Sequence, residues 1–392
     1  MPSYLTARDA SARLQVSRAT LYAYVSRGLI RSRARNGSTA REYSIEDVER
    51  LTKQKSGRRD PSLVARRALA IDGLPVLESA LTLIEAGRLY YRGKDAIALS
   101  REATFEAVAA ALWAGPFEFR SDLHRPSQRE REHLDTLPFA AAGQRHLAAA
   151  AHRDRQADGS EPEQVRRTGA RILGELTGLA CRFEGSGPSV ARNLSRAWKV
   201  PRSIGPKPLE VALILCADHE LNVSAFTARA IASAGANLYM AIAGALAALS
   251  GQRHGGVTAR VWDWLEEPGE PEALLARRAS AGEALPGFGH PLYPDGDPRA
   301  VRLMETCPDV PARARALALS RAVHERTGLL PNIDFALATL GRCLKLPRRA
   351  PFTLFALGRT AGWVAHCLEQ YATGELIRPR ARYVGVAPEA GR

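Results

Sequence analysis

The segment PFTLFALGRTAGWVAHCLEQ, residues 351–370, is rich in Ala and Leu and has the apolar spacing of a helix. Most of the chain after residue 62 shares this composition, and alternating runs of β-branched residues are few. One exception is a short hairpin that we expect over residues 81–91, turning at residues 85–87. We interpret the polar stretch HRDRQADGSEPE, residues 152–163, as a loop between helices. The sequence therefore predicts a mainly α fold.

Four short segments upstream of residue 351 contain the residues that we expect to carry chemistry. From them we single out three histidines, an aspartate and an arginine, a set suited to making an enolate and adding it to a dicarboxylic keto acid. A single histidine on an Ala-rich helix is more often a packed core residue than a catalyst, so the indication of function comes from the ordered set. The segments are CADHELNVS at 216–224, GQRHGG at 251–256, GFGHPLYPDGDPRA at 287–300 and NIDF at 332–335.

These segments, together with LGRTAGW at 357–363 and GRLYYRGKD at 87–95, closely resemble the citrate synthase family. The resemblance covers roughly residues 75–385, and its strength lies in the number of elements that follow one another in the family order. It implies a dimeric, two-domain helical enzyme that condenses acetyl-CoA with oxaloacetate. Coenzyme A would enter as a substrate, and neither a metal nor a tightly held cofactor is implied. The implied domains are a large one, residues 62–257 plus 342–392, and a small one, residues 258–341.

The chemistry of this reaction explains why such residue types are needed. A thioester methyl is a weak carbon acid, so its deprotonation needs a carboxylate base and a donor to the enol oxygen. The resemblance implies that Asp334 is the base, His254 the enol donor and His290 the donor that polarises the ketone. Two substrate carboxylates favour arginines, which bind them in a bidentate way. The implied substrate-binding residues are His219, Arg299, Arg359 and, supplied across the dimer interface, Arg378.

Two positions depart from the pattern of the family. Pro291 follows the histidine of GFGH where the family usually has an arginine, which removes a cation near the expected coenzyme A phosphates. Thr258 stands where the family often has an asparagine. Neither change removes a core catalytic group. The acyl group stays open, because one extra methylene is worth only about 1–3 kcal/mol in a pocket, so 2-methylcitrate synthase activity with propionyl-CoA is an alternative.

Residues 1–58 have a different character. Ser17 can cap a second short helix after a helix over residues 8–14, and Asn36-Gly37 is a strong hairpin signal within a basic stretch. We expect a further helix to begin with a capping box between Ser44 and Asp47. This succession resembles the winged helix-turn-helix of MerR-type regulators and implies binding to duplex DNA. The DNA-binding residues that we expect are Arg18, Thr20 and Tyr24 on the second helix and Arg31, Arg33 and Arg35 on the wing.

Charge supports this interpretation. Residues 1–60 contain 13 Lys and Arg against 6 Asp and Glu, so about one sixth of the chain carries half of its net charge of +14. A local basic excess is typical of a protein that binds the phosphate backbone. Two alternatives remain: the segment could be a protein-binding appendage, or the whole chain could be a transcription regulator that uses the synthase fold as a metabolite sensor.

Cysteine spacing and hydropathy argue against a disulfide-rich, zinc-binding, membrane-spanning or secreted protein. The five cysteines show no ligand spacing, which favours buried thiols over disulfides or a zinc site. No long uncharged apolar run predicts a membrane span, and the amino terminus lacks the apolar core of a signal peptide. We therefore expect a cytoplasmic protein.

Overall fold

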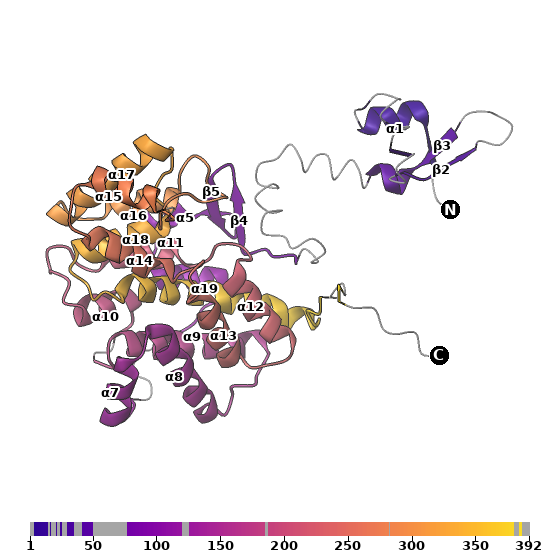
Figure 1. Ribbon diagram of the computed structural model, residues 1–392. Helices are drawn as coiled ribbons and strands as arrows, with labels where there is room; N and C mark the ends of the chain where they lie inside the picture. Colours follow the sequence, from indigo (N-terminus) through magenta and orange to yellow (C-terminus); the bar gives the residue numbers. More distant parts are fainter. Residues whose placement is uncertain are drawn as a thin grey trace. The chain divides into compact units, whose positions relative to one another are not determined.

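The computed structural model is mainly helical and falls into two compact units, Met1–Pro75 and Val76–Arg392 (Figure 1). It describes these residues: 4–14, 16, 21, 24–25, 30–34, 41–49, 77–119, 125–184, 187–281, 283–379 and 384–385.

The amino-terminal unit contains a three-stranded antiparallel sheet in the order β1-β3-β2. Its elements are β1 (Tyr4–Thr6), α1 (Ala7–Leu14), β2 (Ser32–Ala34) and β3 (Arg41–Ser44), with a helical segment over residues 45–49. A small core of buried side chains joins the helices to the sheet, formed by Ala10, Leu14, Leu21, Ile30, Tyr43 and Val48. The predicted wing is present as the β2–β3 pair, whereas β1, which pairs with β3, was not predicted.

The caps of this unit show one correction to the sequence analysis. Thr6 Oγ1 accepts the amide of Asp9, and Ser44 Oγ accepts the amide of Asp47 at 3.4 Å. The reciprocal contact of a capping box, from the amide of Ser44 to the side chain of Asp47, is replaced by contacts with Arg31. The amide of Ser44 donates to the carbonyl of Arg31 in the wing, and the Asp47 carboxylate accepts both the amide and the guanidinium of Arg31. The amide of Ser44 and the carboxylate of Asp47 therefore both bind Arg31, the residue before β2, instead of each other.

The carboxy-terminal unit begins with a second antiparallel sheet, β4 (Thr82–Glu85), β5 (Arg88–Tyr91) and β6 (Lys94–Asp95). This confirms the hairpin predicted over residues 81–91, and Ala86 and Gly87 at its turn have φ of 48° and 72°. Helices make up most of the remaining unit. They are α5 (Ala96–Glu102), α6 (Phe105–Leu112), α7 (Gln128–Thr136), α8 (Phe139–Arg153), α9 (Pro162–Ala180), α10 (Val190–Ala197), α11 (Lys207–Leu215), α12 (Val223–Ser233), α13 (Leu238–Leu249), α14 (Val257–Glu266), α15 (Pro271–Ser280), α16 (Pro298–Glu305), α17 (Pro311–Thr327), α18 (Ile333–Cys343) and α19 (Ala350–Thr373).

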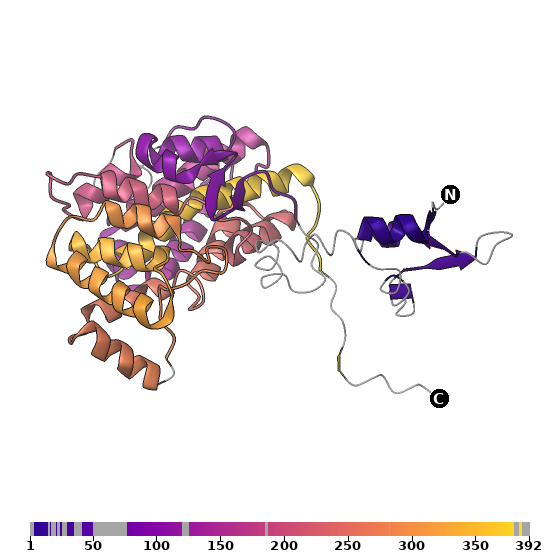
Figure 2. The ribbon, with the colours of Figure 1, turned by 90° about the horizontal axis from the view of Figure 1, so that it is seen from above.

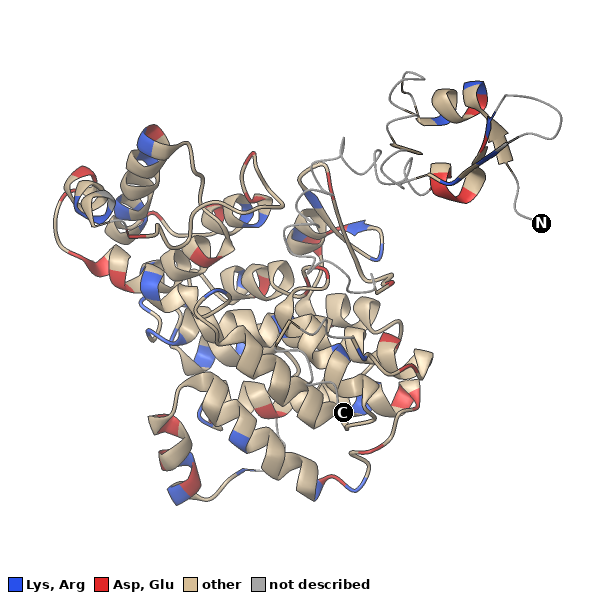
Figure 3. Ribbon diagram, turned by 45° about the vertical axis from the view of Figure 1, so that its right-hand side comes forward, with Lys and Arg blue, Asp and Glu red and all other residues tan. Residues whose placement is uncertain are grey.

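Helix α19, which contains the segment quoted first, runs through the middle of this unit (Figures 1 and 2). It contacts α6, α9, α11, α12, α13, α14 and α18. Among its 24 residues only Arg359 and Glu369 are Lys, Arg, Asp or Glu, and Figure 3 shows that the inner helices are nearly free of such charges. An apolar helix of this kind is stable only when it is buried on all sides.

Two glycines let α19 approach the end of α11 and the chain that follows it. A Cβ atom added at Gly358 would lie 2.6 Å from the carbonyl oxygen of Leu213, and one at Gly362 would lie 2.5 Å from that of Ala217. The amide of Gly362 donates to Ala217 at 2.9 Å, outside the usual helical pattern. The backbone of residues 213–218 is therefore held directly against the helix that carries Arg359.

A second hydrophobic cluster is formed by α14, α15, α17 and α18, including Trp264, Phe288 and Phe335. All its buried members lie between residues 261 and 338, while the main cluster takes residues from most of the remaining unit. The division into a large and a small domain stays a prediction.

Other expectations concern loops, thiols and membranes. The polar stretch at 152–163 contains the end of α8 and the start of α9 with a connection between them, as predicted. All five cysteines are buried free thiols, which confirms the prediction. Among the described residues, no helix is long and apolar enough to cross a membrane.

Candidate active site

Two loops of the small hydrophobic cluster are tied together and set the frame of the site. Gly289 and Leu330 are joined by a backbone hydrogen bond of 2.8 Å, and Asn332 donates its amide to Gly287 and its side chain to Gly289. Gly287 and Gly289 have φ of 84° and 72°, a region that favours glycine, which explains both glycines of GFGH. The histidine of this motif is therefore held beside the start of α18.

Asp334 lies in the first turn of α18. Asn332 caps this helix by accepting the amide of Asp334 at 3.0 Å. The Asp334 side chain is partly buried, and its Oδ1 is buried without a hydrogen-bond partner in the part of the chain that the structure describes. Burial raises the pKa of Asp334 to about 7, and the nearby charges of Arg299 and Arg359 oppose this rise. The carboxylate is thus poised to exchange a proton near neutral pH.

Arg299 lies in the first turn of α16 and is almost fully buried, with an exposed fraction of 2%. Its Nε and Nη2 donate to the two oxygens of Asp297 at 2.9 and 2.8 Å, a bidentate pair. The guanidinium also lies over the ring of Tyr293, 5.2 Å from its centroid. Burial would lower the pKa of Arg299, but the Asp297 carboxylate outweighs it and raises that pKa, so the guanidinium stays charged.

His219 and His290 meet in the same region. Their ring centroids lie 5.1 Å apart, and His219 Nε2 is 3.0 Å from the hydroxyl of Tyr293. The Nδ1 of His290 accepts the amide of Leu292 at 3.2 Å, which leaves the imidazole proton on Nε2 in the neutral form. His290 is thus a neutral donor through Nε2.

His254 is anchored through Ser224 at the start of α12. Its Nε2 lies 2.9 Å from Ser224 Oγ, which also accepts the indole N–H of Trp363 at 3.1 Å. Ser224 Oγ lies 2.7 Å from Asn222 Oδ1 as well, so its one proton can serve either that oxygen or His254. When the proton serves His254, the imidazole carries its own proton on Nδ1, the nitrogen available to donate to a ligand.

The turn that carries His254 is stabilised by its neighbours. A Cβ atom added at Gly256 would lie 2.5 Å from the carbonyl oxygen of Ser250, so the second glycine of HGG is required by the turn itself. Thr258, which stands where the related sequences often have asparagine, donates to the carbonyl of Gly255 at 2.9 Å. The departure at Thr258 therefore preserves the support of the turn.

Arg359 lies halfway along α19, with an exposed fraction of 1%. Its Nε donates to the carbonyl of Cys216 at 2.9 Å, and its guanidinium lies over the ring of Phe355. The ring of His254 contacts Phe355 from another side, at 5.9 Å between centroids. Burial lowers the pKa of Arg359, and the buried carboxylate of Asp218 partly opposes this.

Next to His219, Asp218 is held by Thr82 Oγ1 at 2.5 Å and lies 3.3 Å from His366 Nε2. Both Asp218 and His366 have an exposed fraction of 0%. His366 is therefore a buried residue of α19 that packs against Asp218.

The electrostatics of the site favour neutral imidazoles. Burial, together with Arg359, lowers the pKa of His254 to about 3, and burial with Arg299 lowers that of His290 to about 4. Burial lowers the pKa of His219 as well, with Arg299 as the next cause. At neutral pH all three rings are therefore uncharged donors or acceptors among two fixed cations.

The structure brings together six of the seven residues predicted for this site. Shared neighbours, short distances and mutual electrostatic effects join His219, His254, His290, Arg299, Asp334 and Arg359. Arg378 lies exposed beyond the end of α19, and among the described residues none of these contacts reaches it. Pro291 is exposed beside His290. Sequence reasoning missed Asp297, Tyr293 and Ser224; the helix-start signal Asp-Pro at 297–298 was the one available clue.

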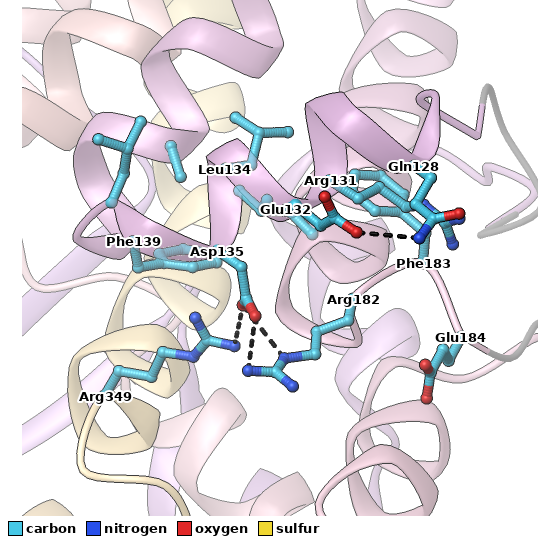
Figure 4. A pocket seen from close by; sticks show the side chains of 13 residues that line it. Gln128, Arg131, Glu132, Leu134, Asp135, Phe139, Arg182, Phe183, Glu184 and Arg349 are labelled. Carbon is cyan, nitrogen blue, oxygen red and sulfur yellow. Dashed lines mark hydrogen bonds and ion pairs between the residues drawn. The ribbon is translucent and has the colours of Figure 1, made fainter.

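Of two pockets in the carboxy-terminal unit, one coincides with part of this site. One is lined by Gly289, His290, Tyr293, Asp297 and the segment 328–331. Another lies between α7, α8 and the end of α9 and contains none of the predicted site residues (Figure 4). In the latter, Asp135 pairs with Arg182 and Arg349 at 2.6 and 2.9 Å.

The structure covers the predicted DNA-binding residues in part. Arg18, Thr20 and Arg35 lie outside the described residues. Tyr24 is half-buried and packs against the core of the amino-terminal unit. Arg31 pairs with Glu46 and Asp47, and Arg33 pairs with Glu42, although both guanidinium groups remain exposed.

The mainly helical fold places buried imidazoles, arginines and carboxylates together, and the family comparisons identify the chain as an enzyme of the transferase class. Comparison with known families is specific. The chain belongs to the citrate synthase family: the model of the citrate synthase C-terminal domain matches residues 70–380. The model of the MerR helix-turn-helix family of regulatory proteins matches residues 5–56.

Relatives and solved structures agree with the family. A citrate synthase of Haloferax volcanii is 32% identical over 361 residues, which cover 80% of this chain and 95% of the relative. A 2-methylcitrate synthase of Corynebacterium glutamicum is 30% identical, and the match covers 77% of this chain and 90% of that relative. The crystal structure of citrate synthase from Thermotoga maritima has a TM-score of 0.65 and 27% identity, covering 82% of this chain and 97% of that one.

Proposed function

We propose that this chain condenses acetyl-CoA with oxaloacetate to give citrate and free coenzyme A. The observation that carries the proposal is the setting of Asp334, a partly buried carboxylate with a pKa of about 7 between two buried arginines and among neutral imidazoles. A base of this pKa is suited to a carbon acid at neutral pH. The family membership and the citrate synthase named above support the choice of substrates.

In the first step, Asp334 takes a proton from the methyl group of the thioester. The electron pair of the broken C–H bond moves into the enolate, whose oxygen accepts a hydrogen bond from neutral His254. A neutral donor suits this step, because an imidazolium with a pKa of about 3 would be costly to keep protonated. Ser224 orients the ring by its contact with Nε2 at 2.9 Å.

In the second step, the enol carbon attacks the keto carbon of oxaloacetate and forms the new C–C bond. The carbonyl π bond breaks, and its oxygen receives a proton with the help of His290, whose Nε2–H is the donor. Water then attacks the thioester carbon, the C–S bond breaks, and the thiolate leaves with a proton as coenzyme A. Citrate and free thiol are the products.

Oxaloacetate is bound as a dianion. Arg299 and Arg359 supply two buried cations for the carboxylates of oxaloacetate. His219 lies near them and can accept or donate a hydrogen bond. Arg378 is exposed in one chain, so we propose that it acts on the site of the partner in a dimer. Coenzyme A enters as a substrate and leaves as a product.

The test is thiol release by purified protein supplied with acetyl-CoA and oxaloacetate, with citrate identified by mass spectrometry. Omission of oxaloacetate and the Asp334→Asn variant are the controls, and the latter excludes contamination by a host enzyme. Thiol release that depends on both substrates and on Asp334 supports the proposal. Absence of citrate from active, substrate-saturated protein refutes it.

The acyl group is decided by the same assay with propionyl-CoA. The 2-methylcitrate synthase relative is as close a match as several citrate synthases, which favours testing this alternative. A higher kcat/KM for propionyl-CoA than for acetyl-CoA would mean that the product is 2-methylcitrate and not citrate. Discrimination by a single methylene rarely exceeds about 200-fold.

We further propose that residues 1–58 bind duplex DNA. The support is the helix-turn-helix family match over residues 5–56, the basic excess of this segment and the β2–β3 wing. Because Arg31 and Arg33 already pair with carboxylates of their own unit, we expect the strongest contacts from other basic residues, such as Arg18 and Arg35. A metabolite-sensing regulator would combine both activities in one chain.

Binding is tested with the full-length protein and fragments of genomic and random DNA across a salt series. Affinity should fall with salt with a log–log slope of roughly −0.9 per neutralised phosphate. A protein lacking residues 1–58 is the control and should bind neither DNA. Equal binding with and without this segment would refute the proposal. Addition of oxaloacetate to the DNA assay separates a sensor, whose affinity changes, from an enzyme with an independent DNA-binding appendage.

A further inference from the structure

Asp297 caps α16 and is more deeply buried than any described carboxylate of the site except Asp218, with a side-chain exposed fraction of 0%. Its Oδ1 accepts the amide of Arg299 at 3.0 Å and the Nε of the same residue at 2.9 Å. Its Oδ2 accepts the Nη2 of Arg299 at 2.8 Å and the amide of Ile333 at 3.0 Å. Each oxygen of the carboxylate therefore has two donors.

This arrangement joins the start of α16 to the start of α18, through residues that lie 36 positions apart in sequence. The amide of Arg299 belongs to the start of α16, its guanidinium reaches into the site, and Ile333 precedes Asp334 in α18. The bidentate contact fixes the plane of the guanidinium and leaves its Nη1 for a ligand. The bond to Ile333 fixes the backbone one residue before the carboxylate base.

We propose that Asp297 is a positioning residue that holds the keto acid-binding Arg299 and the base Asp334 in one fixed relation. This inference rests on the proposed function for the identity of the reaction. It assigns a role to a residue that does not itself touch substrate. An ordinary helix cap would need one oxygen, whereas Asp297 uses both oxygens on groups that serve the two substrates.

Asp297 acts on Asp334 through its charge as well as through its hydrogen bonds. The groups that face Asp334 are Arg299 and Asp297 from the start of α16, Arg359 from α19 and the thiol of Cys216. Burial is the main cause of the raised pKa of Asp334, and Asp297 acts in the same direction, while the two arginines lower it. Without Asp297 the charge of Arg299 would be uncompensated, so the pKa of Asp334 should fall.

Two variants test the proposal. Asp297→Asn keeps the shape of the side chain but turns an amide NH₂ toward two donors, whichever way it is oriented. Asp297→Ser keeps a side chain that caps helices well and removes both the charge and the guanidinium contact. The matched control is Asp154→Asn. Asp154 is a partly buried carboxylate that binds Arg171, Tyr239 and the amide of Gln156 away from the predicted site residues.

Three quantities are measured on each full-length protein. The first is the titration of Asp334, followed by the infrared band of its protonated carboxyl as the difference from the same protein with Asp334→Asn. The second is oxaloacetate affinity by calorimetry, and the third is kcat against pH. We expect both Asp297 variants to titrate Asp334 at lower pH and to lose roughly tenfold or more in oxaloacetate affinity, while Asp154→Asn loses stability alone.

The outcomes are distinct. An unchanged Asp334 titration in a folded Asp297 variant, or an equal loss of affinity in the Asp154 control, overturns the proposal. Failure of both Asp297 variants to fold assigns a purely structural role and also overturns it. If the titration of Asp334 shifts in the variants but the parent protein releases no thiol, the proposed function is refuted and the positioning role of Asp297 stands. The two results are separate because the titration needs no turnover.

Discussion

Replacing Asp334 by asparagine is the most informative perturbation, because it removes one proton-binding group and almost no volume. The amide cannot accept a proton from the thioester methyl, so thiol release should fall by about 10²-fold or more. Oxaloacetate affinity should stay nearly unchanged, because Arg299 and Arg359 remain. The same substitution should also change stability in a way that depends on pH.

The direction follows from the raised pKa. The carboxyl of Asp334 has a pKa of about 7 in the folded chain against an ordinary 3.8. Its protonated form therefore stabilises the fold fully below pH 3.8, and this contribution is lost as pH rises through about 7. Such a difference corresponds to at most ~4 kcal/mol, and partial solvent contact reduces it to roughly 1–3 kcal/mol. At pH 8 the asparagine variant should be more stable than the parent by this amount.

The assay is urea unfolding of both proteins at equal concentration from pH 4 to pH 8, together with the thiol assay. The free energies of unfolding should coincide near pH 4, separate progressively as pH rises toward about 7, and differ by a constant amount above it. A pH-independent difference would show that Asp334 does not titrate in this range. Turnover within a few-fold of the parent would remove Asp334 from the role of base.

Three further predictions follow from the same contacts. Arg359→Leu and Arg299→Leu should each weaken oxaloacetate binding by about 2–5 kcal/mol in calorimetry, and unchanged affinity would make that arginine structural. The kcat/KM of the parent should rise with pH and level off above about 7, because the base must be ionised; a flat profile from pH 5 to pH 8 would contradict this. Gly362→Ala should lower the free energy of unfolding by about 1–3 kcal/mol or more, since its Cβ would lie 2.5 Å from a carbonyl oxygen, and a neutral effect would mean that α19 can shift.

The sequence predicted the fold class and indicated most of the candidate site, because both depend on local patterns and motifs. Helical periodicity identified α19, and the turn residues 85–87 identified the β4–β5 hairpin. Motif order then indicated six residues that the structure brings together.

What escaped prediction depends on contacts between distant parts of the chain. Strand β1 has three residues, too few for a visible alternation, and it forms by pairing with β3. The second half of the Ser44 capping box is lost because Asp47 binds Arg31, sixteen positions away. Asp297 reads as an ordinary cap until its contact with Ile333, 36 positions later, is seen. A local pattern cannot encode such a partner.

The burial of Arg359 in the middle of α19 has a consequence for the dynamics of the protein. Amide hydrogens in a helix packed on all sides exchange with solvent only when the whole unit opens, so those near Arg359 should be among the slowest to exchange. A ligand held by this residue therefore acts on the cooperative opening of the entire helical unit. Oxaloacetate should slow exchange throughout the core, as far as helices that never touch it, by the factor 1 + [L]/Kd.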